Sequence, residues 1–353
     1  MIDRRTFGRA LGVGTGAAAT SLTGLQGLAS ASGEARGPAG APVVPTVRPG
    51  THTSFPALKQ VKAGLLNVGY AELGPARGPV VICLHGWPYD IHSYVDVAPL
   101  LAAQGYRVIV PFLRGHGSTR FLSRHTFRNA QQSAVALDII ALMDALRIDR
   151  AVLAGFDWGS RTADIIAALW PERVKALVSV SGYLVTNLGM QRDPLAPAAE
   201  HTWWYQYYFA TDRGKKAMED KDKRPELCRL VWTQVSPTWA FDDATFQRTA
   251  AAFENPDYAA VVIHNYRWRL SLAPGERAYD RYERALDAGP AVSVPTVTLD
   301  AELDPFTAPD DGASYRRFFT GPYRHHTLRG VGHNLPQEAP SEFARAVVEA
   351  DHL

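Results

Sequence analysis

Apolar residues change their spacing from about residue 58 onward, and the new pattern predicts regular secondary structure. Short runs of apolar, mostly β-branched residues predict buried strands, because a strand covered on both faces carries apolar side chains at successive positions. The first two runs are short and close together, so we predict that they form an antiparallel pair. The predicted strands span residues 61–66, 70–73, 80–84, 106–111, 151–155, 174–181, 292–300 and 324–328.

Stretches with helical spacing lie between these strands. Apolar side chains recur every three or four residues over 130–146, and we also predict helices over 158–169 and 341–350. Strands that alternate with helices indicate an α/β protein, in which a mostly parallel, doubly wound sheet is covered by helices on both faces.

The alternation stops between the strands that end near residue 181 and begin near residue 292. This stretch contains no run typical of a buried strand and is dense in aromatic residues, namely Trp203, Trp204, Tyr205, Tyr207, Tyr208, Phe209, Trp232, Trp239, Phe241, Tyr266 and Trp268. We interpret it as a helical cap, residues 184–285. The cap would be inserted into an α/β core formed by residues 58–183 and 286–353.

The N-terminal part of the chain lacks apolar periodicity. It resembles a twin-arginine (Tat) export signal, because Arg4 and Arg5 precede a long, nearly uncharged stretch with a small-residue cleavage site at Ala29-Ser30-Ala31. That stretch is too weakly apolar to span a membrane, for which about 20 strongly apolar residues are expected. We predict a signal peptide over residues 1–31 and a linker rich in Pro, Gly, Ala and Thr over residues 32–57. The Tat export machinery would then be a partner, and the mature protein would be secreted or extracytoplasmic; the alternative is a frayed tail with a chance pair of arginines.

Composition excludes several classes of protein. Of the 353 residues, 46% are hydrophobic and 20% are charged, a mixture typical of globular proteins and not of disordered chains or coiled coils. The formal net charge of +2 contains no basic excess for nucleic-acid binding, and removal of residues 1–31 would take away three arginines and one aspartate and leave the charges balanced. The two cysteines, Cys83 and Cys228, are too few for a disulfide framework.

The strand predicted at 151–155 leads into Gly155-Phe156-Asp157-Trp158-Gly159, which has the spacing of a nucleophile elbow. Glycine on both sides suits a tight turn, and the central side chain then projects at the carboxyl ends of the strands, where open α/β sheets place their sites. The central residue is Asp157 rather than serine. Its carboxylate needs no base for activation and attacks an sp³ carbon that carries a leaving oxygen or halide, so that an ester forms. The other interpretation makes Asp157 the N-cap of the following helix.

The segment His85-Gly86-Trp87-Pro88 follows the strand predicted at 80–84. We expect the backbone N–H groups of Trp87 and Trp158 to form an oxyanion hole, because both lie directly after strand ends at the same edge of the sheet. We interpret His85 as a structural residue that packs this loop.

The candidate base is His333, which follows the last predicted strand on a glycine-rich loop. A carboxylate after the preceding strand should orient its imidazole. Asp304 lies in that loop and Asp300 lies at the strand end, and we favour Asp304. The order along the chain, with the nucleophile first, then the acid and then the histidine, is that of α/β-hydrolases. The other interpretation of His333 is a surface histidine.

The motifs His-Gly-Trp-Pro, Asp-Trp-Gly and Gly-Val-Gly-His-Asn resemble the core motifs of the α/β-hydrolase superfamily and, within it, of the epoxide hydrolases. The resemblance covers residues 60–353. It implies a cis peptide between Trp87 and Pro88, and two cap tyrosines that bond the epoxide oxygen and supply a proton. The first tyrosine is identified with Tyr205, early in the cap, and the second with Tyr266, late in the cap.

Phe112 departs from that family, because many relatives carry an acidic residue there, and two further positions partly resemble dehalogenases. Arg161, four residues after Asp157, matches one of the two arginines with which fluoroacetate dehalogenases hold a carboxylate, but the other position is Trp158. Trp158 would also suit halide binding, as in haloalkane dehalogenases, although those usually carry Asn or Glu where this chain has Trp87. We therefore name Trp158 and Arg161 as candidate substrate-binding residues.

These patterns predict an epoxide hydrolase that opens an epoxide to a vicinal diol through an alkyl ester on Asp157. The main alternative is a hydrolytic dehalogenase with the same Asp157, Asp304 and His333, and the cap tyrosines discriminate between the two because a halide leaves unprotonated. A ligand-binding receptor on the same scaffold is the third possibility, and the complete catalytic set argues against it. The aromatic cap favours an apolar substrate. We expect no cofactor and no metal, since His325-His326 lacks a third ligand at a suitable spacing.

Overall fold

The computed structural model describes residues 44–307 and 311–353. These residues fall within one unit, Pro42–Leu353. The predicted signal peptide, residues 1–31, and the first part of the predicted linker lie outside the described residues.

The described part of the predicted linker, residues 44–57, is attached to the core. The backbone N–H groups of Gly50 and His52 donate hydrogen bonds to the two carboxylate oxygens of Asp96, at 2.7 and 2.6 Å. Asp96 is buried, and a buried carboxylate requires such donors. This segment therefore packs as part of the fold, which its Pro- and Gly-rich composition does not indicate.

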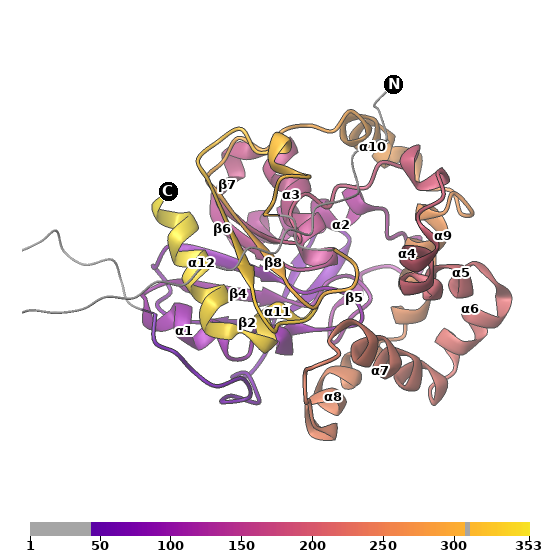
Figure 1. The fold of residues 1–353 in the computed structure, drawn as a ribbon, viewed down its shortest axis with the longest axis horizontal. Helices are drawn as coiled ribbons and strands as arrows, with labels where there is room; N and C mark the ends of the chain where they lie inside the picture. The colour runs from indigo at the N-terminus through magenta and orange to yellow at the C-terminus, as the bar shows by residue number, and fades with distance from the viewer. Residues whose placement is uncertain (1–43, 308–310) are drawn as a thin grey trace, which may run out of the picture. The chain divides into compact units, whose positions relative to one another are not determined.

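A mixed sheet forms the centre of the α/β core (Figure 1). Its strand order is β1-β2-β4-β3-β6-β7-β8-β9, and β5 pairs with β2. β2 is antiparallel to β1, β4 and β5, and the neighbours from β4 to β9 are parallel. The strands are β1 (Lys59–Ala63), β2 (Leu66–Leu73), β3 (Val80–Leu84), β4 (Arg107–Pro111), β5 (Arg120–Phe121), β6 (Ala151–Gly155), β7 (Val174–Val180), β8 (Thr296–Ala301) and β9 (Tyr323–Leu328).

Most strands lie near the apolar runs that predict them, but β5 has no predicted counterpart, and β2 and β8 each begin four residues from the predicted start. The sequence predicts a strand from residue 292, but β8 begins at Thr296. Val292 makes only an isolated bridge to Phe319, and Pro295 has no N–H group to donate to a sheet ladder. Val292 and Val294 are buried, but they lie outside the strand β8.

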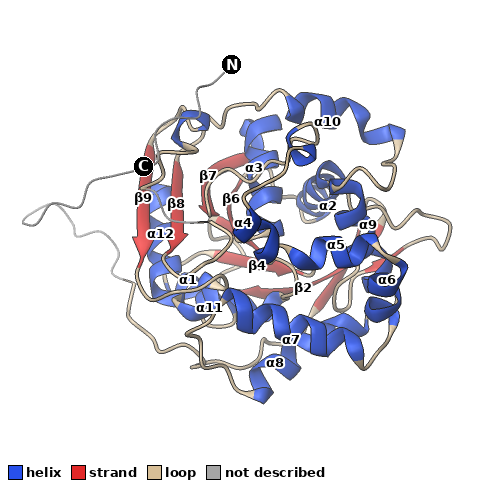
Figure 2. Cartoon of the chain, turned by 45° about the vertical axis from the view of Figure 1, so that its right-hand side comes forward, coloured by secondary structure: helices blue, strands red, loops and turns tan. Residues whose placement is uncertain are grey.

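Helices cover both faces of the sheet (Figure 2). α3 packs against β3, β6 and β7 and against α2, whereas α12 packs against β6, β7 and β8 and against α1. The helices of the core are α1 (Val97–Ala103), α2 (Gln132–Ala145), α3 (Trp158–Leu169), α11 (Leu335–Glu338) and α12 (Pro340–His352), with short 3₁₀ turns at Ile91–Tyr94, Pro171–Arg173 and Arg316–Phe318.

A helical region is inserted between β7 and β8, and in Figure 1 its helices α4 to α9 gather on one side of the sheet. Its helices are α4 (Pro197–Thr202), α5 (Trp204–Ala210), α6 (Asp212–Glu219), α7 (Lys223–Val235), α8 (Asp243–Ala250), α9 (Tyr258–Arg269) and α10 (Asp280–Asp287), with 3₁₀ turns at Met190–Arg192, Ala251–Glu254 and Arg277–Tyr279. Among the residues that the structure describes, no helix has both the length and the apolar character needed to cross a membrane. The predicted α/β fold with an inserted helical cap is confirmed.

The cap is hydrogen-bonded to two loops of the core. Nε1 of Trp232, in α7, donates to the backbone oxygen of Pro88 at 2.9 Å. The backbone N–H of His333 donates to the oxygen of Val235, at the end of α7, at 3.0 Å. α7 therefore holds the loop after β3 and the loop after β9 in fixed positions over the carboxyl ends of the strands.

Candidate active site

Asp157 lies on a sharp turn between β6 and α3, with φ of +52° and ψ of −122°. An aspartate in this conformation is strained, at a cost of about 1–3 kcal/mol, and the surroundings must enforce it. The flanking glycines explain how: a Cβ on Gly159 would lie 1.8 Å from the backbone oxygen of Leu84, and one on Gly155 would lie 2.4 Å from the carbonyl carbon of Gly159. The Asp157 carboxylate makes no capping hydrogen bond to α3, so the alternative role as an N-cap is not realised.

The loop after β3 touches the Asp157 carboxylate. The backbone N–H of Trp87 donates to Oδ1 of Asp157 at 2.7 Å. The close approach requires Gly86, because a Cβ there would lie 2.4 Å from Cβ of Asp157. The Trp158 amide opens α3 directly after Asp157, and the Trp87–Pro88 peptide is cis, as the resemblance implies.

His333 stands between two carboxylates. Its Nδ1 donates to Oδ2 of Asp304 at 2.7 Å, and its Nε2 lies 3.7 Å from Oδ2 of Asp157. Asp300 has a different partner, since the hydroxyl of Tyr315 donates to its Oδ1 at 2.8 Å. The structure therefore brings together Asp157, His333 and Asp304, with Asp304 on the far side of the imidazole from the nucleophile.

The two carboxylates control the ionisation of His333. Burial by itself would lower the pKa of His333, but the charges of Asp304 and Asp157 outweigh it and raise this pKa to about 10. For Asp157, burial acts to raise the pKa, and pairing with His333, the charge of Arg161 and the Trp87 N–H together lower it below its usual value. At neutral pH the site therefore holds an ionised nucleophile beside an imidazolium.

The two cap tyrosines lie together over this site. Tyr205 in α5 and Tyr266 in α9 are both buried, their ring centroids are 5.4 Å apart, and each ring lies 5.2 Å from that of Trp87. Burial and the charge of Asp157 raise the pKa of Tyr205 above its usual value, and burial raises that of Tyr266 as well. Both phenols are therefore protonated at neutral pH and act as donors.

His85 faces away from this chemistry. Its Nδ1 donates to the backbone oxygen of Gly86 at 2.9 Å, and its Nε2 accepts from the N–H of Leu113 at 3.1 Å. Its ring packs edge-on against His116, with centroids 4.9 Å apart. His85 therefore ties the loop after β3 to the loop after β4, a structural role.

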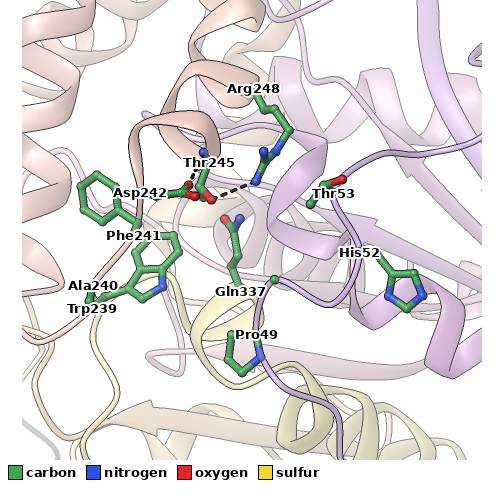
Figure 3. A pocket seen from close by; sticks show the side chains of 11 residues that line it. Pro49, His52, Thr53, Trp239, Ala240, Phe241, Asp242, Thr245, Arg248 and Gln337 are labelled. Carbon is green, nitrogen blue, oxygen red and sulfur yellow. Dashed lines mark hydrogen bonds between the residues drawn. The ribbon is translucent and has the colours of Figure 1, made fainter.

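A cavity of about 280 Å³ opens onto the nucleophile. It is lined by Asp157, Arg161, Ser181, Tyr183, Leu184, Val185, Thr186, Gln191, Trp203, Arg269, Phe306, Thr307 and His333. A second cavity, of about 310 Å³, lies elsewhere, between the segment that includes Pro49 and the loop and helix that carry Trp239 and Arg248 (Figure 3). Its lining includes none of the predicted site residues, so the 280 Å³ cavity is the candidate substrate site.

Comparison with known proteins agrees with this geometry. Residues 79–340 match the family described as alpha/beta hydrolase fold. The chain belongs to the α/β hydrolase fold family. A crystal structure from Klebsiella pneumoniae, of a protein provisionally assigned as an epoxide hydrolase, is 56% identical, with a TM-score of 0.82, over 84% of this chain and 97% of that chain.

Curated relatives place this α/β hydrolase in one branch of the family. Epoxide hydrolase A of Mycobacterium tuberculosis is 28% identical over 323 residues, which cover 83% of this chain and 97% of that protein. A haloalkane dehalogenase of Mycobacterium marinum is 26% identical over 295 residues, which cover 80% of this chain and 88% of that protein. The chain therefore lies in the branch that contains epoxide hydrolases and haloalkane dehalogenases.

Of the cavity residues that the sequence analysis did not identify, Arg269 is the one with a signal in the sequence. It lies three residues after Tyr266 on α9, and residues three apart share one face of a helix. That spacing could have placed a guanidinium beside the second tyrosine. Trp203 and Phe306, which also line the cavity, carry no comparable signal because they lie at a helix end and in a loop.

Proposed function

We propose that this α/β hydrolase is an epoxide hydrolase that opens an epoxide to a vicinal diol through an alkyl ester on Asp157. The observation that carries the proposal is an ionised carboxylate on a strained elbow, with a histidine–aspartate pair on one side and two buried phenols above it. The similarity to proteins named epoxide hydrolases supports the same activity.

In the first step the carboxylate attacks the substrate. Oδ1 of Asp157 accepts the N–H of Trp87, which leaves Oδ2 as the attacking atom. Oδ2 forms a bond to one epoxide carbon while the bond from that carbon to the ring oxygen breaks. Tyr205 and Tyr266 hydrogen-bond the ring oxygen, and one of them transfers its proton to the departing alkoxide. The enzyme then carries a hydroxyalkyl ester.

In the second step water hydrolyses the ester. The His333 imidazolium first gives its proton to the tyrosinate left by the first step, because the esterified Asp157 no longer carries the charge that helped to hold that proton. Its Nε2, which makes no hydrogen bond with a described residue and faces Asp157, then takes a proton from a water molecule between them. The hydroxide attacks the carbonyl carbon of the ester, and the N–H groups of Trp87 and Trp158 stabilise the oxyanion. Collapse of this intermediate breaks the bond from the carbonyl carbon to the alkyl oxygen. The departing alkoxide takes the proton of the new carboxyl group, so that the diol is released, the carboxylate of Asp157 returns and His333 is again an imidazolium. Asp304 stabilises the imidazolium during this step.

The direct test is turnover of a panel of epoxides, with the diol as the measured product. Asp157→Asn provides the matched control, because it keeps the volume of the side chain and removes the anionic nucleophile. The proposal predicts diol formation by the wild type and none by Asp157→Asn. Equal turnover by the two proteins would exclude Asp157 as the nucleophile.

A hydrolytic dehalogenase is the second candidate, and one observation favours it. Nε1 of Trp158 is buried and has no hydrogen-bond partner among the described residues, so it could donate to a departing halide. The two phenols argue for the epoxide, because a halide needs no proton in order to leave. Halide release from haloalkanes, measured in parallel with diol formation, decides between the two candidates.

We also propose that the protein is exported by the Tat machinery. The support is the order of Arg4 and Arg5, the uncharged stretch and Ala29-Ser30-Ala31 in the sequence. Replacement of both arginines by Lys should leave the precursor in the cytoplasm. Mature protein outside the membrane from that variant would exclude the twin-arginine route.

A further inference from the structure

Two buried arginines line the cavity that opens onto Asp157. Arg161 lies on α3, four residues after the nucleophile, and Arg269 lies at the end of α9 in the cap. Each side chain is almost fully buried, at 7% exposure, and the Nε of each has no hydrogen-bond partner among the described residues. In residues 44–307 and 311–353, no carboxylate lies within ion-pair distance of either guanidinium. Buried arginines are normally paired, so these two require an explanation.

Arg269 packs against aromatic rings, whereas a buried arginine usually pairs with a carboxylate. Its guanidinium carbon lies 5.3 Å from the ring centroid of Trp203 and 6.0 Å from that of Tyr266. Stacking on a ring engages the face of the guanidinium and leaves the N–H donors around its edge available. The packing therefore positions Arg269 without using the donors that would bind an anion.

The positive charges of the two arginines repel each other. Burial and the charge of Arg269 lower the pKa of Arg161 to about 10, so Arg161 remains charged at neutral pH beside a second cation. Asp157 attracts Arg161, but the same carboxylate is already shared with His333. With His333 protonated, the cavity is lined by one carboxylate, that of Asp157, and by three cations, namely Arg161, Arg269 and the imidazolium. Asp304, behind His333, supplies a second negative charge. One positive charge is left over, and a bound anion would neutralise it.

A candidate counter-ion for Arg161 is Asp164, which lies one turn later on α3. No ion pair joins Asp164 to Arg161 among the described residues, and Oδ2 of Asp164 accepts the backbone N–H of Leu184 at 2.8 Å. Burial raises the pKa of Asp164 to about 7, so this carboxyl is only partly ionised at neutral pH. Asp164 therefore offsets the excess positive charge in the cavity only in part.

We propose that the substrate is a small epoxide that carries a carboxylate, and that Arg161 and Arg269 bind this carboxylate while the oxirane lies against Asp157. This inference rests on the proposed epoxide hydrolase activity and replaces the apolar substrate expected from the cap aromatics. A planar carboxylate matches the paired N–H donors of a guanidinium. The cavity of about 280 Å³ lies just below the usual range of about 300–1,000 Å³ for ligand sites, which suits a substrate of a few carbon atoms.

The experiment compares three epoxides with the full-length protein. Glycidate carries a carboxylate on the oxirane, glycidamide has the same skeleton with a neutral amide, and styrene oxide is apolar. We expect kcat/KM for glycidate to exceed that for glycidamide by roughly tenfold or more, because hydrogen bonds to a charged group are the strong ones. A preference for glycidamide or styrene oxide would overturn the inference, and so would no turnover of glycidate by an enzyme that hydrolyses other epoxides of the panel. Absence of diol from every epoxide of the panel would overturn the proposed function itself.

Variants test the two arginines directly. Arg161→Gln and Arg269→Gln should each lower the ratio of kcat/KM for glycidate to kcat/KM for glycidamide by roughly 10- to 100-fold, mainly through the KM for glycidate. Arg229→Gln is the matched control: it removes a cap arginine that pairs with Asp243 at the surface, and it should leave both substrates unaffected. Equal losses on glycidate and glycidamide in the two cavity variants would show that the arginines only support the fold.

A measurement on the wild type removes any dependence on folding of the variants. Propanoate and propanamide have nearly the same shape, but only propanoate is charged. Propanoate should inhibit glycidate turnover competitively with an inhibition constant at least about tenfold lower than that of propanamide. Equal inhibition by the two compounds would overturn the inference and would leave the epoxide hydrolase activity unaffected.

Discussion

Nε2 of His333 lies 3.7 Å from Oδ2 of Asp157, too far for a hydrogen bond and close enough for an ion pair. The charge of Asp157 therefore helps to keep His333 protonated in the free enzyme, where its pKa is about 10. Alkylation turns Asp157 into a neutral ester and removes that charge. The pKa of His333 then falls, and the imidazole becomes a base at the stage when a base is needed.

This coupling predicts different pH dependences for the two steps. Alkylation needs an ionised Asp157, whose pKa is lowered from 3.8, so its rate should stay constant through mildly acidic pH. Ester hydrolysis needs a neutral His333, so its rate should fall as the pH drops through the pKa of His333 in the alkyl-enzyme. Rapid-quench measurements at about pH 5 and about pH 8 should show accumulation of the ester only at the lower pH. A parallel decline of both rates would contradict the coupling.

The base can be removed without removing the nucleophile. His333→Gln should still alkylate Asp157 but should not hydrolyse the ester, because glutamine cannot accept the proton from water. Mass spectrometry should then show an adduct with the mass of enzyme plus epoxide, on the peptide that contains Asp157. A haloalkane would instead give the mass of enzyme plus substrate minus hydrogen halide. Absence of any adduct on Asp157 would exclude the two-step mechanism.

The phenols can be tested as the acid. Replacement of Tyr205 and Tyr266 by Phe removes two proton donors and keeps most of the packing around Trp87. Loss of general-acid catalysis typically costs roughly 10²- to 10⁴-fold, so alkylation by an epoxide should slow by at least that much. Halide release from a haloalkane, which needs no acid, serves as the comparison. Intact epoxide turnover in the double variant would favour the dehalogenase.

The sharp turn at Asp157 requires a glycine at position 159, and the free energy of unfolding should show this requirement. Gly159→Ala places a methyl group 1.8 Å from the backbone oxygen of Leu84, so the strand end and the helix must move apart. The free energy of unfolding should decrease by at least about 1–3 kcal/mol, the usual cost of overpacking. Gly189→Ala is the control, because Gly189 has φ of −62° and its nearest neighbour is the flexible side chain of Asn187. Denaturant unfolding that shows no difference between the two variants would contradict the steric account.

The site residues that belong to the α/β core are predictable from the sequence, because the topology of the sheet brings the loops that carry them together. Asp157, Trp87, Asp304 and His333 all follow parallel strands, whose carboxyl ends share one edge of the sheet. Apolar runs mark those strands, so the loops after them can be located from the amino-acid sequence alone. The preference for Asp304 over Asp300 follows the same logic, since a loop residue reaches further than one at a strand end.

The site residues that belong to the helical cap are not predictable in this way. Tyr205 and Tyr266 are identified only by resemblance to a family, because aromatic residues in α5 and α9 are buried whether or not they do chemistry. Arg269 escapes a sequence-based prediction because its function depends on which face of α9 turns toward the core, and α9 is buried on most of its surface. Tertiary packing of the cap, and not a local pattern, brings Arg269 to Arg161.

The covalent ester on Asp157 is the central claim, and a single turnover in ¹⁸O-labelled water tests it most directly. With wild-type enzyme in excess over the epoxide, attack of the carboxylate transfers one of its own oxygens to the substrate, and water replaces that oxygen on the enzyme. The label should therefore appear in the Asp157 carboxylate, and the diol from this first turnover should be unlabelled. Label that appears directly in the diol would mean that water attacks the epoxide itself, and Asp157 would then be a base instead of the nucleophile.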